Sequence, residues 1–205
     1  MTDLTLPPFD AIVTREVRWF RSGPMPVSVT EWFASAVANT EREERTDWYD
    51  ADFARDGVGM KRRGTSTIDV KFRVMGSDAV DIAPRMSGRI EDWLKTSTPV
   101  SESSDDRGHH HLEVTKSLMS RRYAIPAPAE PITGCEAELV SIAVASQRAW
   151  GLCFETFGRP EARFEAFDTG IRMFLADTPL PDGMAFTVDE SCGYPDWIAR
   201  LAQRA

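Results

Sequence analysis

Four cationic side chains alternate along residues 57–74, "GVGMKRRGTSTIDVKFRV". The stretch has the pattern of two short strands joined by a turn, and side chains two positions apart in a strand point to the same face. Lys61 and Arg63 therefore share one face of the first strand, and Lys71 and Arg73 share one face of the second. Ammonium and guanidinium groups gathered in this way bind the oxygens of phosphates and carboxylates. The hairpin thus predicts one wall of an anion-binding site.

Charged residues on other predicted strands supply partners for this wall. Further glutamates and cations are Glu16, Arg18, Lys116, Arg121, Glu136, Glu138 and Glu155. The carboxylates can neutralise the cations as internal ion pairs, or they can hold a divalent metal that bridges a polyphosphate gripped by the cations. A third interpretation places the hairpin cations on the solvated outer face of an open sheet, where they would protect an edge.

The composition limits the classes of function. The chain has 205 residues, of which 42% are hydrophobic and 27% are charged, as is typical of a soluble globular protein. Its formal net charge of −8 argues against nucleic acid as a partner, because binding to a phosphate backbone needs a net basic face. One local basic pocket remains compatible with this charge.

Targeting and redox signals are also weak. No apolar run approaches the roughly 20 residues that a membrane helix needs, and the start, "MTDLTLPPFD", lacks the pattern of a signal peptide. We therefore expect a cytoplasmic protein with no membrane partner. Cys135, Cys153 and Cys192 show no CxxC spacing, which favours buried free thiols over disulfides or a zinc site.

Hydrophobic periodicity divides the chain into a strand-rich part and a helical end. Strand patterns occur at 9–21, 45–53, the hairpin 57–74 with its turn at 64–66, 109–125, and a hairpin at 135–158 that turns at 145–148. Residues 78–97 are mixed between strand and helix, and 101–108 form an acidic loop. Helical spacing occurs at 26–37, 159–178 and 194–204. We expect a single domain over 1–205, with barrel strands and an inserted helix in 1–157 and a helical segment packed on them in 158–205.

About eight short strands joined mostly by turns favour an α+β fold built on an antiparallel β-barrel, with helices packed outside. In such a barrel Val70, Phe72 and Val74 would face outward beneath helices, and Lys71 and Arg73 would face the lumen. Because an unpaired buried charge is costly, the lumen should then hold opposing carboxylates, bound water or an anionic ligand.

Short motifs follow one another along these strands in a recognisable order. They are "EVRWF" at 16–20, "DWY" at 47–49, "KRR" and "IDVKFR" in the hairpin, and later "VTKSLMSRRY" and "CEAEL". Over most of the chain they resemble the ExExK, D-x-Y, basic-hairpin, basic-strand and acidic-strand motifs of the CYTH domain, or triphosphate tunnel metalloenzyme superfamily. The nearest likeness is to a bacterial CYTH-like group of unassigned activity.

This resemblance implies a tunnel that binds a triphosphate or another phosphorylated small molecule, with a metal-dependent phosphohydrolase activity. The catalytic residues that it implies are Glu16, Lys71 and Arg73. The phosphate-binding residues that it implies are Arg18, Lys61, Arg63, Lys71, Arg73, Lys116 and Arg121. The ligands that it implies for magnesium or manganese are Glu16, Glu136, Glu138 and Glu155.

Three positions depart from the family pattern, and one of them is Leu118, which stands where the later basic strand would carry another cation. Arg18 and Phe20 stand where the first-strand motif has its second glutamate and its lysine. The change removes a carboxylate and adds a cation, so it weakens metal binding and hydrolysis more than phosphate binding. The alternative function is a non-catalytic scaffold or protein-interaction domain whose tunnel charges cancel internally. The sequence leaves the oligomeric state open, with a homodimer among the alternatives.

Overall fold

The computed structural model describes residues 11–35, 40–54, 57–63, 67–99, 111–126 and 131–202. Within these residues the chain forms eight strands and three α-helices. The strands are β1 (Ala11–Ser22), β2 (Glu41–Asp50), β3 (Val58–Arg63), β4 (Thr67–Ala83), β5 (Met86–Pro99), β6 (His111–Ala124), β7 (Gly134–Val144) and β8 (Gln147–Phe157). The helices are α1 (Val27–Ala34), α2 (Arg163–Asp177) and α3 (Tyr194–Ala202). The predicted turn at 64–66 and the predicted loop at 101–108 lie outside the described residues.

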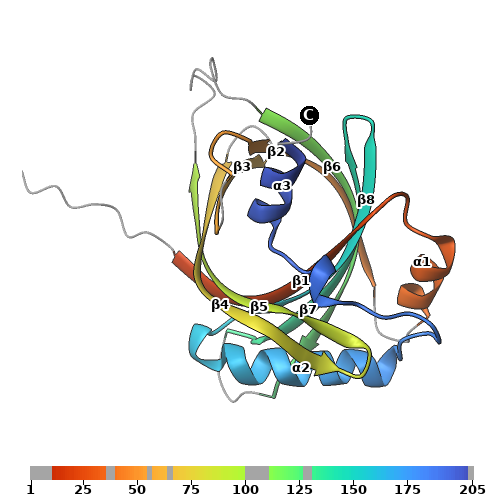
Figure 1. Cartoon of the computed structure of the whole chain (residues 1–205). Coiled ribbons are helices and arrows are strands. Elements are labelled where there is room, and N and C mark those ends of the chain that lie inside the picture. The colour runs from red at the N-terminus through yellow and green to blue at the C-terminus, as the bar shows by residue number, and fades with distance from the viewer. Residues whose placement is uncertain are drawn as a thin grey trace, which may run out of the picture.

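The strands close into an antiparallel barrel in the order β1-β5-β4-β3-β2-β6-β7-β8 (Figure 1). β1 closes the ring because its first half pairs with β5, from Ala11 opposite Thr96, and its second half pairs with β8, up to Ser22 opposite Ala149. The predicted antiparallel barrel with packed helices is therefore confirmed.

The mixed segment at 78–97 belongs to the long hairpin of β4 and β5. Pro84 lies in the tight turn between them, where its missing N–H costs no ladder hydrogen bond, and Arg85 takes a φ of 66°. Gly88 lies within β5, where a Cβ would come within 2.7 Å of the Val17 side chain. The two residues that obscured the strand pattern thus mark a turn and a close contact.

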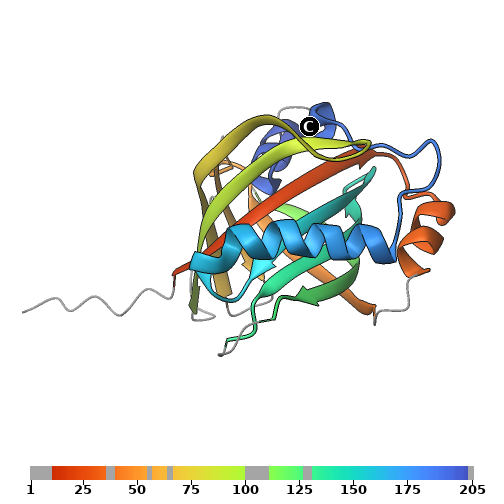
Figure 2. The ribbon, with the colours of Figure 1, turned by 90° about the horizontal axis from the view of Figure 1, so that it is seen from below.

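Helices α1 and α2 pack on the outside of the barrel, and Figure 2 shows α2 lying across the strands. Phe167, Ile171 and Phe174 of α2 are buried at helical spacing against the outer faces of β7 and β8. Phe33 of α1 adds to this core, with its ring centroid 5.7 Å from that of Phe174. The main hydrophobic core therefore lies between these helices and the barrel wall.

One sequence expectation about this packing is wrong. Phe72 and Val74 are 39% and 57% exposed, so the outer face of β4 is not covered by helices. Helix α2 instead contacts β7, β8, β6 and β1. The outer face of β4 is thus open to solvent at Phe72 and Val74.

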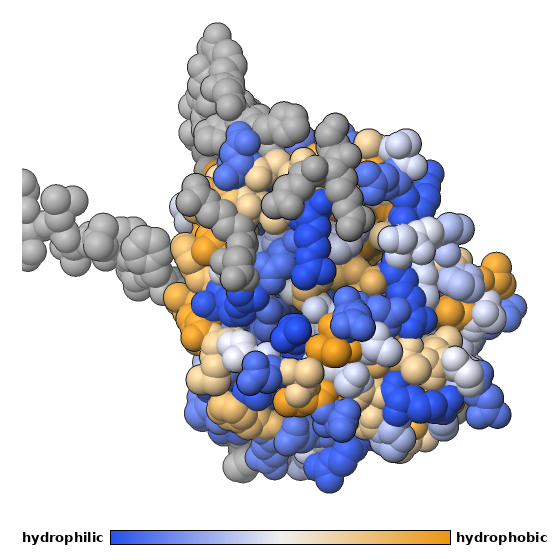
Figure 3. Space-filling model, in the orientation of Figure 1, coloured by the Kyte–Doolittle hydropathy of each residue, from blue (hydrophilic) through white to orange (hydrophobic). Residues whose placement is uncertain are grey.

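Helix α3 occupies one end of the barrel rather than its outer wall. In Figure 1 it lies within the ring of strands. The Tyr194 ring lies 5.0 Å from the ring of Phe20 and 5.7 Å from the ring of Tyr49, centroid to centroid. The face of the molecule seen in this direction is mainly hydrophilic, with smaller apolar groups between the polar ones (Figure 3). None of the described helices is long and apolar enough to cross a membrane.

Candidate functional site

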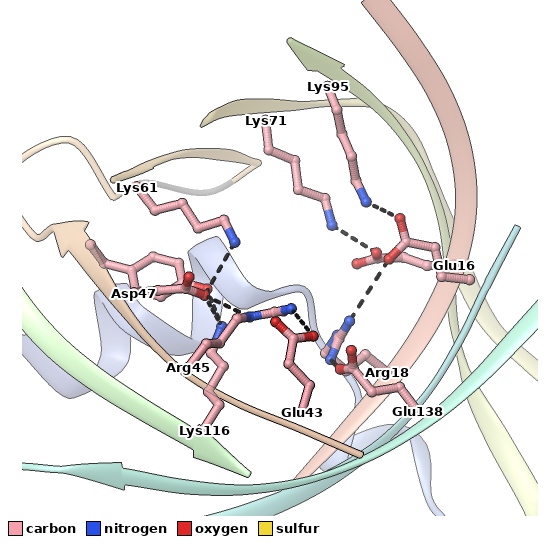
Figure 4. A network of polar contacts seen from close by, with 12 residues as sticks. Glu16, Arg18, Glu43, Arg45, Asp47, Lys61, Lys71, Lys95, Lys116 and Glu138 are labelled. Atoms are coloured by element: carbon pink, nitrogen blue, oxygen red, sulfur yellow. Dashed lines mark hydrogen bonds and ion pairs between the residues drawn. The ribbon is translucent and has the colours of Figure 1, made fainter. Parts of the chain in front are cut away.

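The lysines of this protein gather inside the barrel. The chain has four, Lys61, Lys71, Lys95 and Lys116. They come from β3, β4, β5 and β6, and Figure 4 shows their side chains pointing toward acidic groups of the lumen. Lys116 is only 2% exposed, and Lys61 and Lys71 are 17% exposed each. Lysine is among the residues least often buried, so this placement marks the lumen as a specialised charged interior.

Asp47 of β2 is the hub of one group of contacts (Figure 4). Its Oδ2 atom lies 2.6 Å from Nζ of Lys116, 3.1 Å from Nζ of Lys61 and 3.6 Å from Nε of Arg45. Its Oδ1 atom lies 3.9 Å from Nε of Arg63. The Asp47 side chain is fully buried. Four cationic groups of described residues thus converge on one carboxylate.

A second group of ion pairs joins β1 to β4, β5, β7 and β8. Nζ of Lys71 donates to Oε2 of Glu16 over 2.7 Å. Arg18 donates to Glu138 over 2.8 Å, and its second NH group lies 4.0 Å from Glu155. Nζ of Lys95 also pairs with Glu155. Each of these carboxylates therefore already has a cationic partner from the chain.

Two buried carboxylates of the lumen, Glu16 and Asp47, have lowered pKa values. Burial alone would raise the pKa of Glu16, but the charges of Lys71 and Arg18 lower it to about 2. Burial likewise opposes ionisation of Asp47, and Lys116 and Lys61 overcome it and hold the pKa of Asp47 well below its usual range. The cations therefore dominate the electrostatics at both groups.

Two lysines show the opposite effect, because cations crowd each other in this interior. Burial and the neighbouring Lys71 lower the pKa of Lys95 to about 7, although it pairs with Glu155. Burial and the neighbouring Lys61 lower the pKa of Lys116 to about 7, although it contacts Asp47. An added anion would favour the charged form of both lysines.

A cavity of about 740 Å³ opens at the end of the barrel away from α3. Its lining comes from the starts of β1, β2 and β7 and the ends of β6 and β8, whereas Tyr194 of α3 contacts Phe20 and Tyr49 at the opposite ends of β1 and β2. Charged groups in the lining are Glu41, Arg42, Glu43, Arg45, Arg63, Lys95, Arg122, Glu136, Glu138 and Glu155. The ion-pair network therefore begins in the lining of this cavity, at Arg45, Lys95 and Glu138, and continues toward α3.

The structure brings most of the sequence-predicted site residues together, with clear differences in position. Arg63 is half-exposed. Glu136 and Arg122 both line the cavity, with Nε of Arg122 3.5 Å from Oε1 of Glu136. Arg73 donates to Glu91 and to Asp196 of α3, each over 2.8 Å, so it belongs to the end of the barrel that α3 occupies.

Arg121 lies apart from the other predicted residues. It donates to Thr40 and Thr178, and its guanidinium lies 4.7 Å from the centre of the Phe33 ring. These partners belong to the outer side of the barrel, where α1 and α2 pack. The contacts of Arg121 therefore do not support its predicted role as a phosphate-binding residue of the lumen.

Sequence reasoning missed two cations of the lumen, Arg45 and Lys95. Arg45 lies two positions before Asp47, and Lys95 lies two positions after the fully buried Trp93. Strand alternation could have found both. The mixed pattern at 78–97 concealed the strand that carries Lys95.

One cluster of possible metal ligands in the lumen, Glu16 with Cys153 and Glu155, does not fit a divalent ion. Among the described residues, ligand atoms of Glu16, Cys153 and Glu155 lie within 4.8 Å of one another. Lys71 occupies Glu16, Lys95 occupies Glu155, and burial raises the pKa of the Cys153 thiol above its usual value. A divalent ion would meet ammonium groups and a protonated thiol there. These three residues therefore offer a divalent ion no suitable set of ligands.

Comparisons with known proteins do not identify a relative. No family model matches the chain, and no curated protein matches it. The interpretation of the lumen therefore depends on its own geometry, and the motif resemblance to the CYTH domain stays a prediction.

Proposed function

We propose that the lumen binds a phosphorylated anionic small molecule of the triphosphate type. The observation that supports this most directly is the convergence of Lys61, Lys116, Arg45 and Arg63 on the single carboxylate of Asp47. Nζ of Lys116 and Nζ of Lys61 already donate charge-assisted hydrogen bonds to a carboxylate oxygen, and phosphate oxygens accept the same kind of bond. The cavity volume of about 740 Å³ is also within the usual range for small-molecule sites.

The lowered pKa values of Lys95 and Lys116 also favour a bound anion. A bound phosphate group would bring negative charge to Lys95 and Lys116, whose pKa values of about 7 reflect burial and neighbouring cations. The ligand would thereby stabilise the protonated form of both groups. Binding therefore couples to the uptake of protons near neutral pH.

The proposal is binding rather than hydrolysis. Phosphate transfer needs groups that offset charge on the phosphoryl oxygens and a positioned nucleophile. Lys71 and Arg18 can offset charge, but Glu16 and Glu138 are committed to them in ion pairs. A catalytic role for Glu16, Lys71 and Arg73, and a role for magnesium or manganese, remain predictions from the family resemblance.

A second function is favoured by the same ion pairs. Glu16 with Lys71, Glu138 with Arg18, and Glu155 with Lys95 cancel charge within the lumen. A scaffold or protein-interaction domain with an internally neutralised barrel would have this arrangement. It would gain no stability from small phosphorylated molecules.

A thermal-shift panel separates the two functions. Tripolyphosphate, nucleoside triphosphates and orthophosphate are each added at equal ionic strength, in chelator and then with magnesium or manganese. We expect tripolyphosphate in chelator to raise the melting temperature by several degrees, since a ligand that binds the folded state stabilises it. An unchanged melting temperature with every compound would favour the scaffold.

A further inference from the structure

Helix α3 and the residues before it contact β1 and β2 at one end of the barrel. The Cys192 amide donates to the Arg18 carbonyl over 3.1 Å, which anchors the chain on β1. Trp197 stacks on Phe20 with ring centroids 4.7 Å apart and planes 11° apart. The Tyr194 ring stacks beside Tyr49 of β2 at 5.7 Å. Helix α3 therefore packs against the side chains of Phe20 and Tyr49, which face the lumen.

The same segment contacts the strands on the other side of the ring. Asp196 accepts a hydrogen bond from Arg73 of β4 over 2.8 Å and another from the Gly57 amide over 3.0 Å. A Cβ on Gly59 of β3 would lie only 2.8 Å from Cγ of Pro195. The glycine thus lets α3 approach the wall closely.

Apolar packing fills this end of the barrel. Val114 of β6, Val140 and Ile142 of β7, and Ile198 of α3 belong to one buried cluster and are at most 1% exposed. A phosphate chain that crossed this layer would lose its hydration and find no hydrogen-bond donors or cations in exchange, which is strongly unfavourable. The layer therefore separates the charged lumen from solvent beyond α3.

Tyr194 marks the boundary between the charged and the apolar parts. Nζ of Lys116 lies 4.1 Å from the centre of its ring, and the Arg18 guanidinium lies 4.6 Å from it. The same ring contacts Phe20 and Trp197. Lys116 and Arg18 therefore lie against the Tyr194 ring, at the border between the charged lumen and the apolar cluster.

We propose that the lumen is a pocket with one opening, closed by α3, and that it takes only the terminal group of a phosphate chain. This inference rests on the proposed function and specifies its ligand. A short phosphorylated molecule, or the free end of a longer chain, enters through the 740 Å³ cavity. An inner segment of a long chain does not bind, because the chain cannot pass through the barrel.

The test counts protein particles on a long inorganic polyphosphate that is attached to a sensor surface by one end. The chain is many times longer than the barrel, and the mass of the free protein defines one particle. We expect saturation at one particle per chain and complete release by free tripolyphosphate. Lys71→Met is the control for binding inside the lumen, and we expect it to reduce binding at least tenfold. Arg172→Ala, on the exposed face of α2, should bind as the wild type does.

The outcomes separate the two proposals. Several particles per chain, lost in Lys71→Met, would overturn the single opening and leave the proposed function intact. Binding of free tripolyphosphate without any binding to the attached chain would overturn recognition of a chain end. Binding that Lys71→Met does not weaken would place the contact outside the lumen and contradict both proposals. Failure of both probes to bind would remove the proposed function and the inference with it.

Discussion

Lys116 and Asp47 form a deeply buried ion pair inside the barrel, with Nζ 2.6 Å from Oδ2 and side chains 2% and 0% exposed. Nζ of Lys116 also donates to the Tyr49 hydroxyl over 2.7 Å. Such a pair is costly to desolvate, and breaking it leaves an uncompensated buried charge. The arrangement therefore allows stability and ligand binding to be tested with the same variants.

Asp47→Asn should destabilise the protein and increase its response to anions. The substitution keeps the shape but leaves Lys61, Lys116 and Arg45 without their shared negative charge. We expect a loss of about 3 kcal/mol in the free energy of unfolding, measured in urea, as for other buried pairs that lose one partner. Tripolyphosphate should then stabilise the variant more than the wild type.

The control for Asp47→Asn is Asp81→Asn, at an exposed position of β4. Its free energy of unfolding should stay within about 0.5 kcal/mol of the wild type. Equal losses in the two variants would contradict the special role of Asp47.

Stability should rise with pH above neutrality because of Lys116. Its pKa is about 7 in the folded protein and near 10.5 in the unfolded chain, so the unfolded state binds more protons between these values. The free energy of unfolding therefore increases with pH across this window, by at most about 1.4 kcal/mol per pH unit for one group. Urea unfolding at pH 7, 7.5 and 8 measures the slope, below the range in which the cysteines, whose pKa values burial raises, would ionise in the unfolded chain and oppose it.

Lys116→Met is the comparison for the pH series. It removes the titrating group and keeps an unbranched side chain, so the slope should become shallower. The part that remains should come from Lys95, whose pKa is also about 7. Identical slopes in wild type and variant would show that Lys116 is not the titrating group.

Amine labelling can report directly on the lumen, because all four lysines point into it. We expect an amine-acylating reagent to modify Lys95, at 31% exposure, much faster than Lys116, at 2%. Tripolyphosphate should slow the labelling of Lys95, as measured by peptide mass spectrometry. Similar rates at Lys95 and Lys116, or no protection by tripolyphosphate, would argue against an occupied lumen.

The barrel could be predicted from strand alternation, and so could the direction of its main cationic wall. Lys61 and Lys71 sit two positions from Arg63 and Arg73 in their strands, and Lys61, Arg63 and Lys71 contact acidic groups of the lumen. The same rule contradicts Arg121, which lies five positions after Lys116 in β6. An odd separation along a strand points two side chains to opposite faces.

The position of α3 inside one end of the barrel could not be predicted from the sequence. The pattern of 194–204 indicates an amphipathic helix, but amphipathicity does not say which surface the apolar face meets. Only the three-dimensional contacts of Tyr194, Asp196 and Trp197 place this helix inside the ring. The exposure of Phe72 and Val74 could not be predicted for the same reason, since a strand pattern does not reveal whether a helix covers its apolar face.

Gly170→Ala should destabilise the protein, although alanine is the better helix former. A Cβ at this position of α2 would lie 2.2 Å from Cβ of Cys135 on β7, which forces the helix away from the barrel. We expect a net loss of about 1–3 kcal/mol in the free energy of unfolding, because overpacking outweighs a propensity gain of about 1 kcal/mol. A more stable variant in urea unfolding would contradict the tight contact of α2 with β7.

Calorimetric titration with tripolyphosphate in the presence of a metal chelator tests the proposed binding site most directly. We expect saturable binding to the wild type and unchanged affinity in Arg172→Ala. The affinity of Lys71→Met and of Lys116→Met should be at least tenfold weaker, which corresponds to a loss of about 1.4 kcal/mol in binding free energy. Equal affinity in the two lumenal variants and the wild type, or no binding by the wild type, would contradict an anion site in the barrel.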